Sequence, residues 1–580
     1  MTESPVIEKR QTDVNNNLSS VEGAKQIEEN FKDLLDKIRY KEMWSNQHFE
    51  VFNYEAGTGK SRITQLLLGL YTQKRDDSVL YVQKFSRDGE LQSTVDRINE
   101  YAKCEVAAYL DSQDNKGSKK RRREKLKSQI LVITHRMYEQ VCYSEHEDII
   151  SGRQILIIDE FPDILDRIKV EMSDIQWLWS NSHKFINSEL IEMLARELRD
   201  QLHRFEKDPY YIQNVPYYSH EVSNGNMVDD LEDFLSTYKK SEDASIVERI
   251  LFVLKNGCFY NNQAFHTFND NVAYKMLDNN IILDANGGLD ARYNLSSLFQ
   301  VKEQPKKYNY SNSSLIHYDV KTSKESLSNY VNFYYQVLEK EPIDLKQRTL
   351  FITDKNNFDD LRESLIGHLS AISPLKDPEM LIDKVVSIDY FGNIIGVNTY
   401  QMFDKVVILK TPNFDYIDYV LQSHFFDDNE QHDDSISMFN DERVEPIRLT
   451  MIAGEFYQAL KRINRDNQLP AQYVLFTDNS QAVDMIESEL PGINRYDYAF
   501  KPKTNQKETE SGRQRNWRNC IRDYLLQCKK EGRTQVTKKE LRDNLGLQDN
   551  SNLSKYLKDL QYFMSQHGIE PEHHHIVFRQ

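Results

Sequence analysis

The sequence predicts an α/β protein with two successive parallel-sheet units, a helical insertion and a small C-terminal unit. Short, continuous runs of β-branched and other apolar residues alternate with amphipathic helix patterns, which is typical of parallel sheets that are buried on both faces. The runs that we interpret as strands are Phe49–Glu55, Val79–Val82, Ile130–Ile133, Ile155–Ile158, Ile281–Leu283, Leu350–Thr353, Val406–Leu409 and Val474–Phe476. At 580 residues the chain is also too long for one hydrophobic core, and about three or four folding units are expected.

The order of these patterns divides the chain into domains. In the middle, Leu190, Leu194, Leu198 and Leu202 recur every four residues, which predicts helices rather than strands. The polar stretch Phe500–Arg513 is typical of a linker. The predicted parts are a disordered leader at 1–24, a first α/β domain at 25–170 plus 276–315, a helical insertion at 171–275, a second α/β domain at 320–495, a linker at 500–513 and a C-terminal unit at 514–580.

The composition argues against several classes of protein. Apolar residues make up 39% of the chain and aromatic residues 11%, so global disorder is not expected. The sequence has no run of roughly 18 uninterrupted apolar residues, so we expect no membrane partner. The five cysteines include no CxxC pair, which argues against a zinc ribbon or an iron–sulfur cluster and favours a reduced, cytoplasmic setting.

The net charge of −17 hides an asymmetry along the chain. Residues 501–580 contain 16 Lys and Arg against 10 Asp and Glu, a net charge of +6, whereas the first 500 residues carry −23. A basic C-terminal unit is a candidate surface for nucleic acid. A solvated basic tail is the alternative that composition alone leaves open.

The segment 55–61 (EAGTGKS) has the pattern of a phosphate-binding loop. Its glycines allow backbone N–H groups to wrap around a phosphate, and the helix that follows directs its positive end at the same anion. In such a loop Lys60 reaches the β- and γ-phosphates, and the Ser61 hydroxyl holds Mg²⁺. The position of the usual first glycine is occupied by Tyr54.

A second motif is the apolar strand 155–160 (ILIIDE), which ends in two carboxylates. Such a pair suits a site for a metal-bound nucleotide, with Asp159 at the magnesium ion and Glu160 orienting or deprotonating the attacking water. The motif alone is common, but its pairing with the preceding loop predicts an ATP site.

The third motif is the segment 458–465 (QALKRINR) in the second α/β unit. Arg462 and Arg465 are three residues apart, so we expect a helix that presents both on one face. Arginines placed there are able to reach the γ-phosphate that the first unit holds and to stabilise transition-state charge. An exposed basic helix is the alternative interpretation of this segment.

Taken in order, AGTGKS, IIDE and QALKRINR resemble motifs I, II and VI of the superfamily 2 DEAD/DEAH-like helicases. Further segments are similar to other motifs of that family: VITH (132–135), LDAN (283–286), LFITD (350–354) and IGVN (395–398). The chain departs from the family pattern at Lys461, which replaces a glycine of motif VI, and at LDAN, which lacks the terminal threonine. The box around Glu160 reads DEFP, which matches neither the DEAD nor the DEAH subgroup.

The resemblance implies two tandem RecA-like domains of the P-loop NTPase class that close on ATP and Mg²⁺ at their interface. It implies a catalytic group of Glu160, Arg462, Arg465 and Gln458. The implied nucleotide-binding residues are Gly57, Thr58, Gly59, Lys60, Ser61 and Asp159, with Ser61 and Asp159 at the Mg²⁺. Thr134 and His135 of VITH are then expected to contact the backbone of a nucleic acid.

The C-terminal unit resembles a winged helix-turn-helix, because two short helices flank a glycine-containing turn and a short strand follows. The residues that we expect on its nucleic-acid face are Lys538, Lys539, Asn552, Ser554 and Lys555. Many winged helices contact proteins instead, so a protein partner for this unit remains an alternative.

The sequence therefore predicts an ATP-hydrolysing nucleic-acid helicase or translocase, and the basic C-terminal unit favours DNA over RNA as its track. Two alternatives stay open. One is an RNA helicase. The other is a DNA-binding replication or regulatory protein that uses ATP only as a switch and does not unwind.

Overall fold

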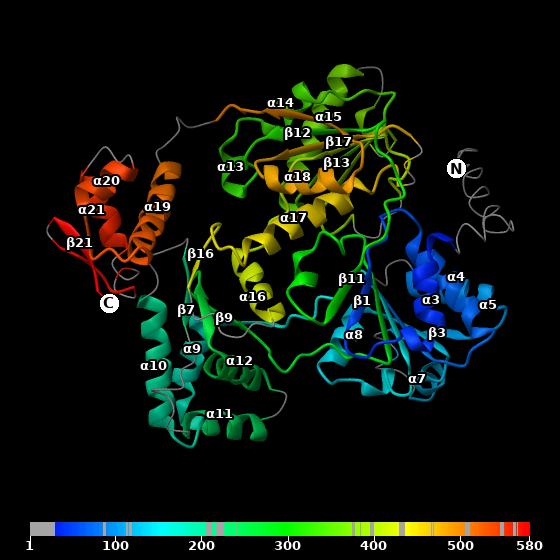
Figure 1. Cartoon of the computed structure of the whole chain (residues 1–580), viewed down its shortest axis with the longest axis horizontal. Coiled ribbons are helices and arrows are strands. Elements are labelled where there is room, and N and C mark those ends of the chain that lie inside the picture. The colour runs from blue at the N-terminus through cyan, green and yellow to red at the C-terminus, as the bar shows by residue number, and fades with distance from the viewer. Residues whose placement is uncertain are drawn as a thin grey trace.

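The computed structural model arranges the chain as two α/β domains, an insertion beside them and a C-terminal unit (Figure 1). The structure describes residues 29–84, 89–111, 114, 119–204, 211–215, 226–238, 241–373, 377–382, 384–394, 399–427, 435–465, 467, 469–504, 511–545, 550–560, 564, 567–572 and 574–579. The predicted leader at 1–24 and the IGVN segment lie outside the described residues.

The first domain contains a seven-stranded sheet, all of whose neighbouring strands pair in parallel, in the order β11-β1-β10-β5-β2-β4-β3. Its strands are β1 (Phe49–Phe52), β2 (Val79–Gln83), β3 (Ala107–Tyr109), β4 (Ile130–Thr134), β5 (Ile155–Asp159), β10 (Asn279–Leu283) and β11 (Phe299–Lys302). The chain leaves this sheet after β5 and returns to its centre at β10, so the ends of β1, β10 and β5 lie side by side.

Helices cover both faces of this sheet, which explains its continuous apolar strands. The α-helices of the domain are α3 (Lys32–Arg39), α4 (Lys60–Thr72), α5 (Glu90–Ala102), α7 (Lys119–Leu126) and α8 (His135–Cys142), and its 3-10 turns are η1 (Lys41–Met43), η3 (Glu147–Ile149) and η5 (Ala291–Asn294). One core joins α3, α4 and α5 to the sheet, and a second core joins α8 to the opposite face. Both predicted α/β patterns are thus realised as doubly covered parallel sheets.

The second domain contains a six-stranded parallel sheet in the order β14-β13-β15-β17-β12-β18. Its strands are β12 (Ser314–Asp319), β13 (Thr349–Thr353), β14 (Val386–Tyr390), β15 (Lys405–Ile408), β17 (Gln472–Thr477) and β18 (Asn494–Ala499). Its helices are α13 (Lys324–Asn329), α14 (Phe333–Lys340), η6 (Lys355–Asn357), α15 (Phe358–Ile372), η7 (Pro378–Met380), α16 (Tyr416–Phe426), α17 (Glu445–Leu460) and α18 (Ser480–Glu489). The predicted fold class of two tandem parallel α/β domains is confirmed.

The leucine periodicity had predicted a helical insertion, but the insertion contains strands as well as helices. Its helices are α9 (Met172–Ser180), η4 (Ser182–Lys184), α10 (Ser188–Arg204), α11 (Asn226–Thr237) and α12 (Glu242–Asn256). They pack on an antiparallel sheet of β6 (Arg167–Glu171), β7 (Tyr211–Val215), β8 (Cys258–Asn261) and β9 (Ala264–Phe268). These strands escaped prediction because they are short and mix polar with aromatic residues, so the apolar period of the helices dominates the segment.

A strand of the second domain completes the insertion sheet. β16 (Ile436–Ser437) pairs antiparallel with β7, and the backbone N–H of Asn214 donates to the Ser435 hydroxyl at 3.0 Å. Helix α16 lies in the same region, and its apolar residues share one core with Ile212 and Phe259 of the insertion. The insertion therefore belongs to the first domain by sequence but is packed firmly on the second.

The C-terminal unit consists of α19 (Ser511–Lys530), β19 (Gln535–Thr537), α20 (Lys538–Leu545), α21 (Asn550–Asp559), β20 (Ile569–Pro571) and β21 (His575–Phe578). Its three strands form an antiparallel sheet in the order β19-β21-β20. The buried Arg522 of α19 lies 4.5 Å from the ring centroid of Tyr211 in β7, so this unit rests on the insertion (Figure 1). Because α19 already begins at Ser511, the predicted linker at 500–513 is too long at its C-terminal end.

None of the helices in the described part of the chain is long and apolar enough to cross a membrane.

Candidate functional site

The loop after β1 has the backbone geometry that a phosphate-binding loop requires. Gly57 and Gly59 adopt left-handed φ values of 88° and 85°, which glycine reaches without steric cost. Gly59 is the N-cap of α4, so Lys60 and Ser61 open the helix and its positive end faces the loop. The Thr58 hydroxyl donates to the Glu55 carbonyl at 2.8 Å and closes the turn. The local sequence thus gives the loop the backbone geometry that the motif predicted, and phosphate binding there stays a prediction.

Asp159 ends β5 beside this loop. Burial raises the pKa of its carboxyl, while the Lys60 charge and the Ser61 hydroxyl act in the opposite direction. Its Oδ2 accepts a hydrogen bond from Tyr81 at 3.3 Å, whereas Oδ1 is buried and bonds to none of the described residues. A buried carboxylate oxygen without a donor, next to a hydroxyl, is the oxygen-rich donor set that Mg²⁺ prefers. Asp159 and Ser61 therefore fit the predicted magnesium ion.

Glu160 lies directly after the strand in a left-handed conformation, with a φ of 72°. A non-glycine residue adopts this conformation only at an energetic cost, and residues strained in this way cluster at functional sites. Its Oε2 lies 2.9 Å from Lys84 Nζ. Burial acts to raise the pKa of Glu160, but the positive charges of Lys84, Lys60 and Arg462 outweigh it and hold the pKa at about 2. Glu160 is therefore an ionised base at neutral pH.

Lys84, at the end of β2, is a site residue that the sequence did not indicate. Removing its charge by Lys84→Met is expected to raise the pKa of Glu160, because burial then meets less opposition. Since the base is active only when ionised, the acid limb of the pH profile of kcat for ATP hydrolysis should move to higher pH. The measurement is kcat between about pH 4 and 9, with the exposed Lys74→Met as control. If kcat of the variant shows no acid limb down to about pH 4, as expected for the parent, Lys84 does not set the ionisation of Glu160.

The VITH segment lies where β4 ends and α8 begins. The Thr134 hydroxyl caps α8 by accepting from the backbone N–H of Met137 at 3.3 Å. Because α8 begins at once, the His135 ring lies beside β5, with Nε2 2.8 Å from the Asp159 carbonyl oxygen. Burial and the Lys84 charge lower the pKa of His135 to about 4, so the ring is neutral. In this structure His135 supports the carboxylate pair, and contact of Thr134 and His135 with nucleic acid stays a prediction.

The arginines of the third motif lie in a turn and not on a helix, which corrects the sequence prediction. Helix α17 ends at Leu460, and Lys461 is its C-cap. Asn464 adopts a left-handed φ of 41°, and its side chain bonds both the N–H and the carbonyl of Leu469, which holds the turn that follows the helix. Gln458 remains on the helix, with a buried Oε1 that has no partner among the described residues.

Arg462 and Arg465 both lie within electrostatic range of the carboxylate pair in the first domain. Burial and the neighbouring Arg465 lower the pKa of Arg462 to about 10, against the opposing effect of Glu160. Burial also lowers the pKa of Arg465, while Glu160 and Asp159 act to raise it. The buried Arg462 and the half-buried Arg465 thus lie in the electrostatic field of the carboxylate pair, and both domains contribute charged groups to one site.

The two domains approach each other closely at the phosphate-binding loop. A Cβ atom added to Gly57 would lie 2.1 Å from the backbone carbonyl oxygen of Arg465. Only a glycine allows the loop to lie this close to the arginine segment. The loop, the carboxylates and the arginines therefore form one site across the interface.

Replacing Gly57 by alanine is expected to force this interface apart. The added methyl group meets a backbone carbonyl, which cannot move out of the way as a side-chain end could, and φ is left-handed as well. We expect kcat for ATP hydrolysis to fall by roughly 10²-fold, because small misplacements at a reacting centre have effects of this size. Gly392→Ala is the control, since it shares the left-handed φ but has open space around it. Equal activity of both variants would contradict the close approach.

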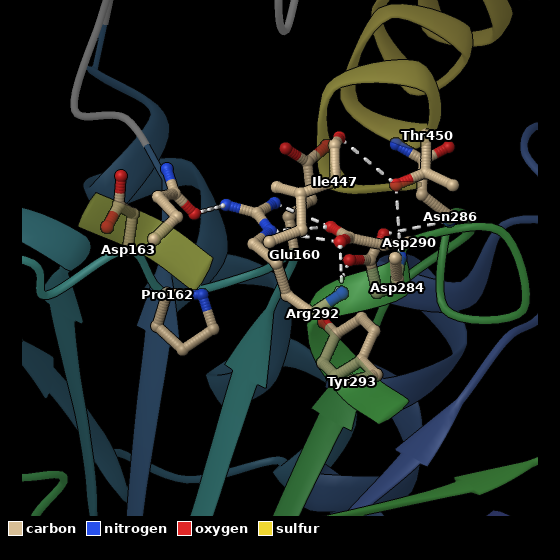
Figure 2. A network of polar contacts seen from close by, with 12 residues as sticks. Glu160, Pro162, Asp163, Asp284, Asn286, Asp290, Arg292, Tyr293, Ile447 and Thr450 are labelled. Carbon is tan, nitrogen blue, oxygen red and sulfur yellow. Dashed lines mark hydrogen bonds and ion pairs between the residues drawn. The ribbon is translucent and has the colours of Figure 1, made fainter. Parts of the chain in front are cut away.

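The LDAN segment ties the first domain to α17 (Figure 2). Asp284 accepts hydrogen bonds from the Tyr293 hydroxyl at 2.8 Å and from the Asn286 backbone at 2.9 Å. Close by, the backbone N–H of Ala291 donates to Thr450 of α17 at 3.1 Å. Asp284 therefore fixes the strand-end turn that contacts the second domain, without the threonine of the family motif.

Arg292 makes a second link between the domains (Figure 2). Its guanidinium pairs with Asp290 and donates to Gln422 of α16 at 2.8 Å. It also lies 3.7 Å from the ring centroid of Phe161, the third residue of the DEFP box. Phe161 packs on Phe426 of α16 in turn. The unusual aromatic residue in this box thus contributes to the contact between the domains.

The predicted nucleic-acid residues of the C-terminal unit are separate from this site. Lys538 and Lys539 open α20, and Ser554 and Lys555 are exposed on α21. Asn552 lies in the first turn of α21. The structure places these five residues in two neighbouring helices of one unit, and their role stays a prediction.

Glu55, Lys461 and Arg292 are further site residues that sequence reasoning did not assign. Lys461 was visible only as a departure from a motif, and Glu55 as the first letter of the loop segment. Arg292 gave no local signal, because its partners are distant in sequence.

Three helicases are among the solved structures that resemble the chain in outline. The Mycobacterium smegmatis helicase Lhr bound to ssDNA and AMP-PNP is 10% identical, with a TM-score of 0.34, and the match covers 92% of this chain and 56% of that one. The DUF1998 helicase MrfA bound to DNA and AMPPNP is 9% identical, with a TM-score of 0.35, and the match covers 96% of this chain and 61% of that one. S. cerevisiae Dbp5 bound to RNA and ADP BeF3 is 10% identical, with a TM-score of 0.32, and the match covers 78% of this chain and 85% of that one.

This chain thus spans less than two thirds of the length of Lhr and MrfA. No protein-family model and no curated protein matches the sequence. At these identities and TM-scores, the role of the chain has to come from its own residues.

Proposed function

We propose that the chain is an ATP-dependent helicase or translocase that acts on DNA. The observation that carries the proposal is the meeting of two domains at one charged site. The phosphate-binding loop and the Asp159–Glu160 pair come from the first domain, and Arg462 and Arg465 come from the second. A site divided in this way is complete only when the domains are closed, which couples ATP hydrolysis to a change in their relative position.

The side chains have separable tasks in this proposal. Lys60 and the N–H groups of the loop hold the β- and γ-phosphates. Glu160 orients the attacking water and accepts its proton, for which its low pKa keeps it ionised. Arg462 and Arg465 stabilise the charge that develops on the transferred phosphoryl group. Gln458, with an unpartnered buried oxygen among the described contacts, helps to position the water.

Asp159 and Ser61 are the residues that would hold Mg²⁺. The ion, when bound there, neutralises phosphate charge during hydrolysis. The unpaired buried Oδ1 of Asp159 supports this assignment, because an oxygen left without a donor is costly unless a ligand uses it.

The preference for DNA rests on the C-terminal unit. Residues 501–580 carry a net charge of +6 in a chain of −17, and the three helices and three strands of this unit occur in the order of a winged helix. Phosphate contacts by its exposed lysines would supply affinity that depends on salt rather than on base sequence.

The test is ATPase activity with single-stranded DNA, duplex DNA and RNA, combined with strand displacement on a forked DNA. The proposal expects the strongest stimulation by single-stranded DNA and ATP-dependent displacement of the fork. Stronger stimulation by RNA would make the chain an RNA helicase. DNA binding that responds to ATP without any displacement or translocation would make it a switch.

The C-terminal unit can be tested without removing it. The triple variant Lys539→Glu, Lys555→Glu and Lys558→Glu reverses three exposed charges. We expect DNA affinity to fall and the salt dependence of binding to decrease by about one per lost phosphate contact, while ATPase activity without DNA is retained. The measurement is a salt titration of the Kd, with the exposed Lys340→Glu of the second domain as control. Unchanged affinity would point to a protein partner for this unit.

A further inference from the structure

A buried lysine lies next to the arginines of the second domain. Lys461 is 2% exposed, and its Nζ donates to the Tyr310 hydroxyl oxygen at 2.7 Å. A buried ammonium group is costly unless polar partners or opposite charge compensate for it. Tyr310 connects this ammonium group to a carboxylate, because the Tyr310 hydroxyl donates to Glu55.

Glu55 belongs to the phosphate-binding loop of the first domain and is also 2% exposed. Besides Tyr310, its carboxylate accepts the backbone N–H groups of Lys307 and Tyr308 at 2.9 and 3.1 Å. These two residues belong to the connection between β11 and β12, the segment that joins the two domains. The loop is therefore bonded directly to the interdomain connection.

Tyr310 completes the link from the other side. It is fully buried in the core of the second domain, together with residues of α17 and α18. The Lys461 ammonium lies 4.7 Å from the Tyr310 ring centroid and 5.1 Å from that of Tyr308, at cation–π distance from both. The Tyr308 hydroxyl in turn donates to the Gly57 carbonyl at 3.1 Å. The lysine is thus held between two rings, and both rings contact the phosphate-binding loop.

We propose that Lys461, Tyr310 and Glu55 form an interdomain latch in which Lys461 is a positioning residue for Arg462 and Arg465. Lys461 immediately precedes Arg462, and the Arg465 carbonyl lies against Gly57, so the latch and the close approach hold the arginine segment at both ends. A segment fixed in this way keeps its guanidinium groups aligned with the phosphates. No conformational entropy is then lost in orienting them at each turnover. The inference rests on the proposed ATP hydrolysis for its catalytic consequence, but not for the latch itself.

The first test separates positioning from binding. Lys461→Met keeps the aliphatic stem but removes the charge and the donor, and Tyr310→Phe removes a single hydroxyl. We expect Lys461→Met to lower kcat for ATP hydrolysis by roughly 10²-fold with little change in KM, because the arginines lose alignment while the loop still binds ATP. Tyr310→Phe should have a smaller effect in the same direction. The double variant should be no worse than Lys461→Met alone, because both remove the same contact.

The control is Tyr473→Phe. Tyr473 is fully buried in the same core as Tyr310, and its hydroxyl has no hydrogen-bond partner among the described residues. The Tyr473→Phe variant should keep the parent kcat, whereas a general loosening of the core would lower kcat in this variant as well. Lys461→Arg, which retains the charge and donors, should restore part of the activity lost in Lys461→Met.

The second test does not depend on ATP hydrolysis. Amide hydrogen exchange at Lys307 and Tyr308 reports the bonds to Glu55, and it should become faster in Lys461→Met and Tyr310→Phe but not in Tyr473→Phe. If the parent chain hydrolyses no ATP, the proposed function is wrong, and this exchange measurement still decides the latch. Parent-like exchange in both variants overturns the latch. Faster exchange with parent kcat shows a structural contact and overturns the positioning role.

Discussion

The Glu160→Gln variant is expected to lose nearly all ATP hydrolysis while it still binds ATP. Glutamine has the same shape as the glutamate but cannot accept a proton from water, and a positioned base is worth about 10²- to 10⁴-fold in rate. We therefore expect kcat to fall by about 10³-fold in the presence of single-stranded DNA. The Kd for a nonhydrolysable ATP analogue should change little, because Lys60 and the loop are intact.

The control for this variant is Glu100→Gln on α5, an exposed glutamate of the same domain. A second variant, Lys60→Ala, should differ in kind, since it removes a phosphate contact and weakens binding as well as turnover. If Glu160→Gln hydrolyses ATP like the parent, another group must activate the water and the site assignment is wrong.

Arg465→Ala is expected to have an effect of similar size through a different route. The guanidinium of Arg465 lies in the field of both Asp159 and Glu160, and it is the second domain that supplies it. Arginines placed in this way are worth about 10³-fold or more in phosphoryl transfer. We expect kcat to fall by about 10³-fold, and Arg462→Ala to behave alike.

The readout that separates these arginines from Glu160 is the coupling between the domains. Binding of an ATP analogue should still close the parent and Glu160→Gln, and should close Arg465→Ala less completely, because the second domain loses a phosphate ligand. The exposed Arg362→Ala on α15 is the control. Full activity of Arg465→Ala and of Arg462→Ala would remove the second domain from the site.

The dependence of the site on both domains also bears on the insertion. β16 of the second domain completes the insertion sheet, and α16 packs on Phe161 beside Glu160. The insertion is positioned to follow the second domain, although the chain enters and leaves it from the first.

The chemistry at strand ends could be predicted from the sequence. The glycines and Lys60 follow directly on β1, and Asp159 and Glu160 end β5, so short segments with fixed spacing carry both motifs. Continuous apolar runs identified eight of the thirteen strands of the two parallel sheets for the same reason, since a strand buried on two faces has no room for polar residues. The sequence did not indicate β3, β11, β12, β14 and β18. These features are local, and a few neighbouring residues determine them.

Contacts between distant segments could not be predicted in this way. The predicted helical face for the arginines was wrong because α17 already ends at Leu460, and the segment that follows is a turn held by the bonds between Asn464 and Leu469. The prediction of a purely helical insertion was incomplete because its short strands are stabilised by partners across the sheet. One of these partners, Ile436, pairs with Ile212 and lies 224 residues further along the chain. Lys84, Arg292 and Tyr310 act through neighbours that the sequence does not place near them.

By itself, the sequence of this protein determined the two parallel α/β domains and the residues that belong to the phosphate loop, the carboxylate pair and the arginine segment. The tertiary structure alone decided that these groups meet at one interface, that Lys84 keeps Glu160 ionised, and that Lys461 reaches Glu55 through Tyr310. The physical reason is that backbone geometry and burial follow from neighbouring residues, whereas the pKa and the position of a buried charge depend on which other charges the fold brings close to it.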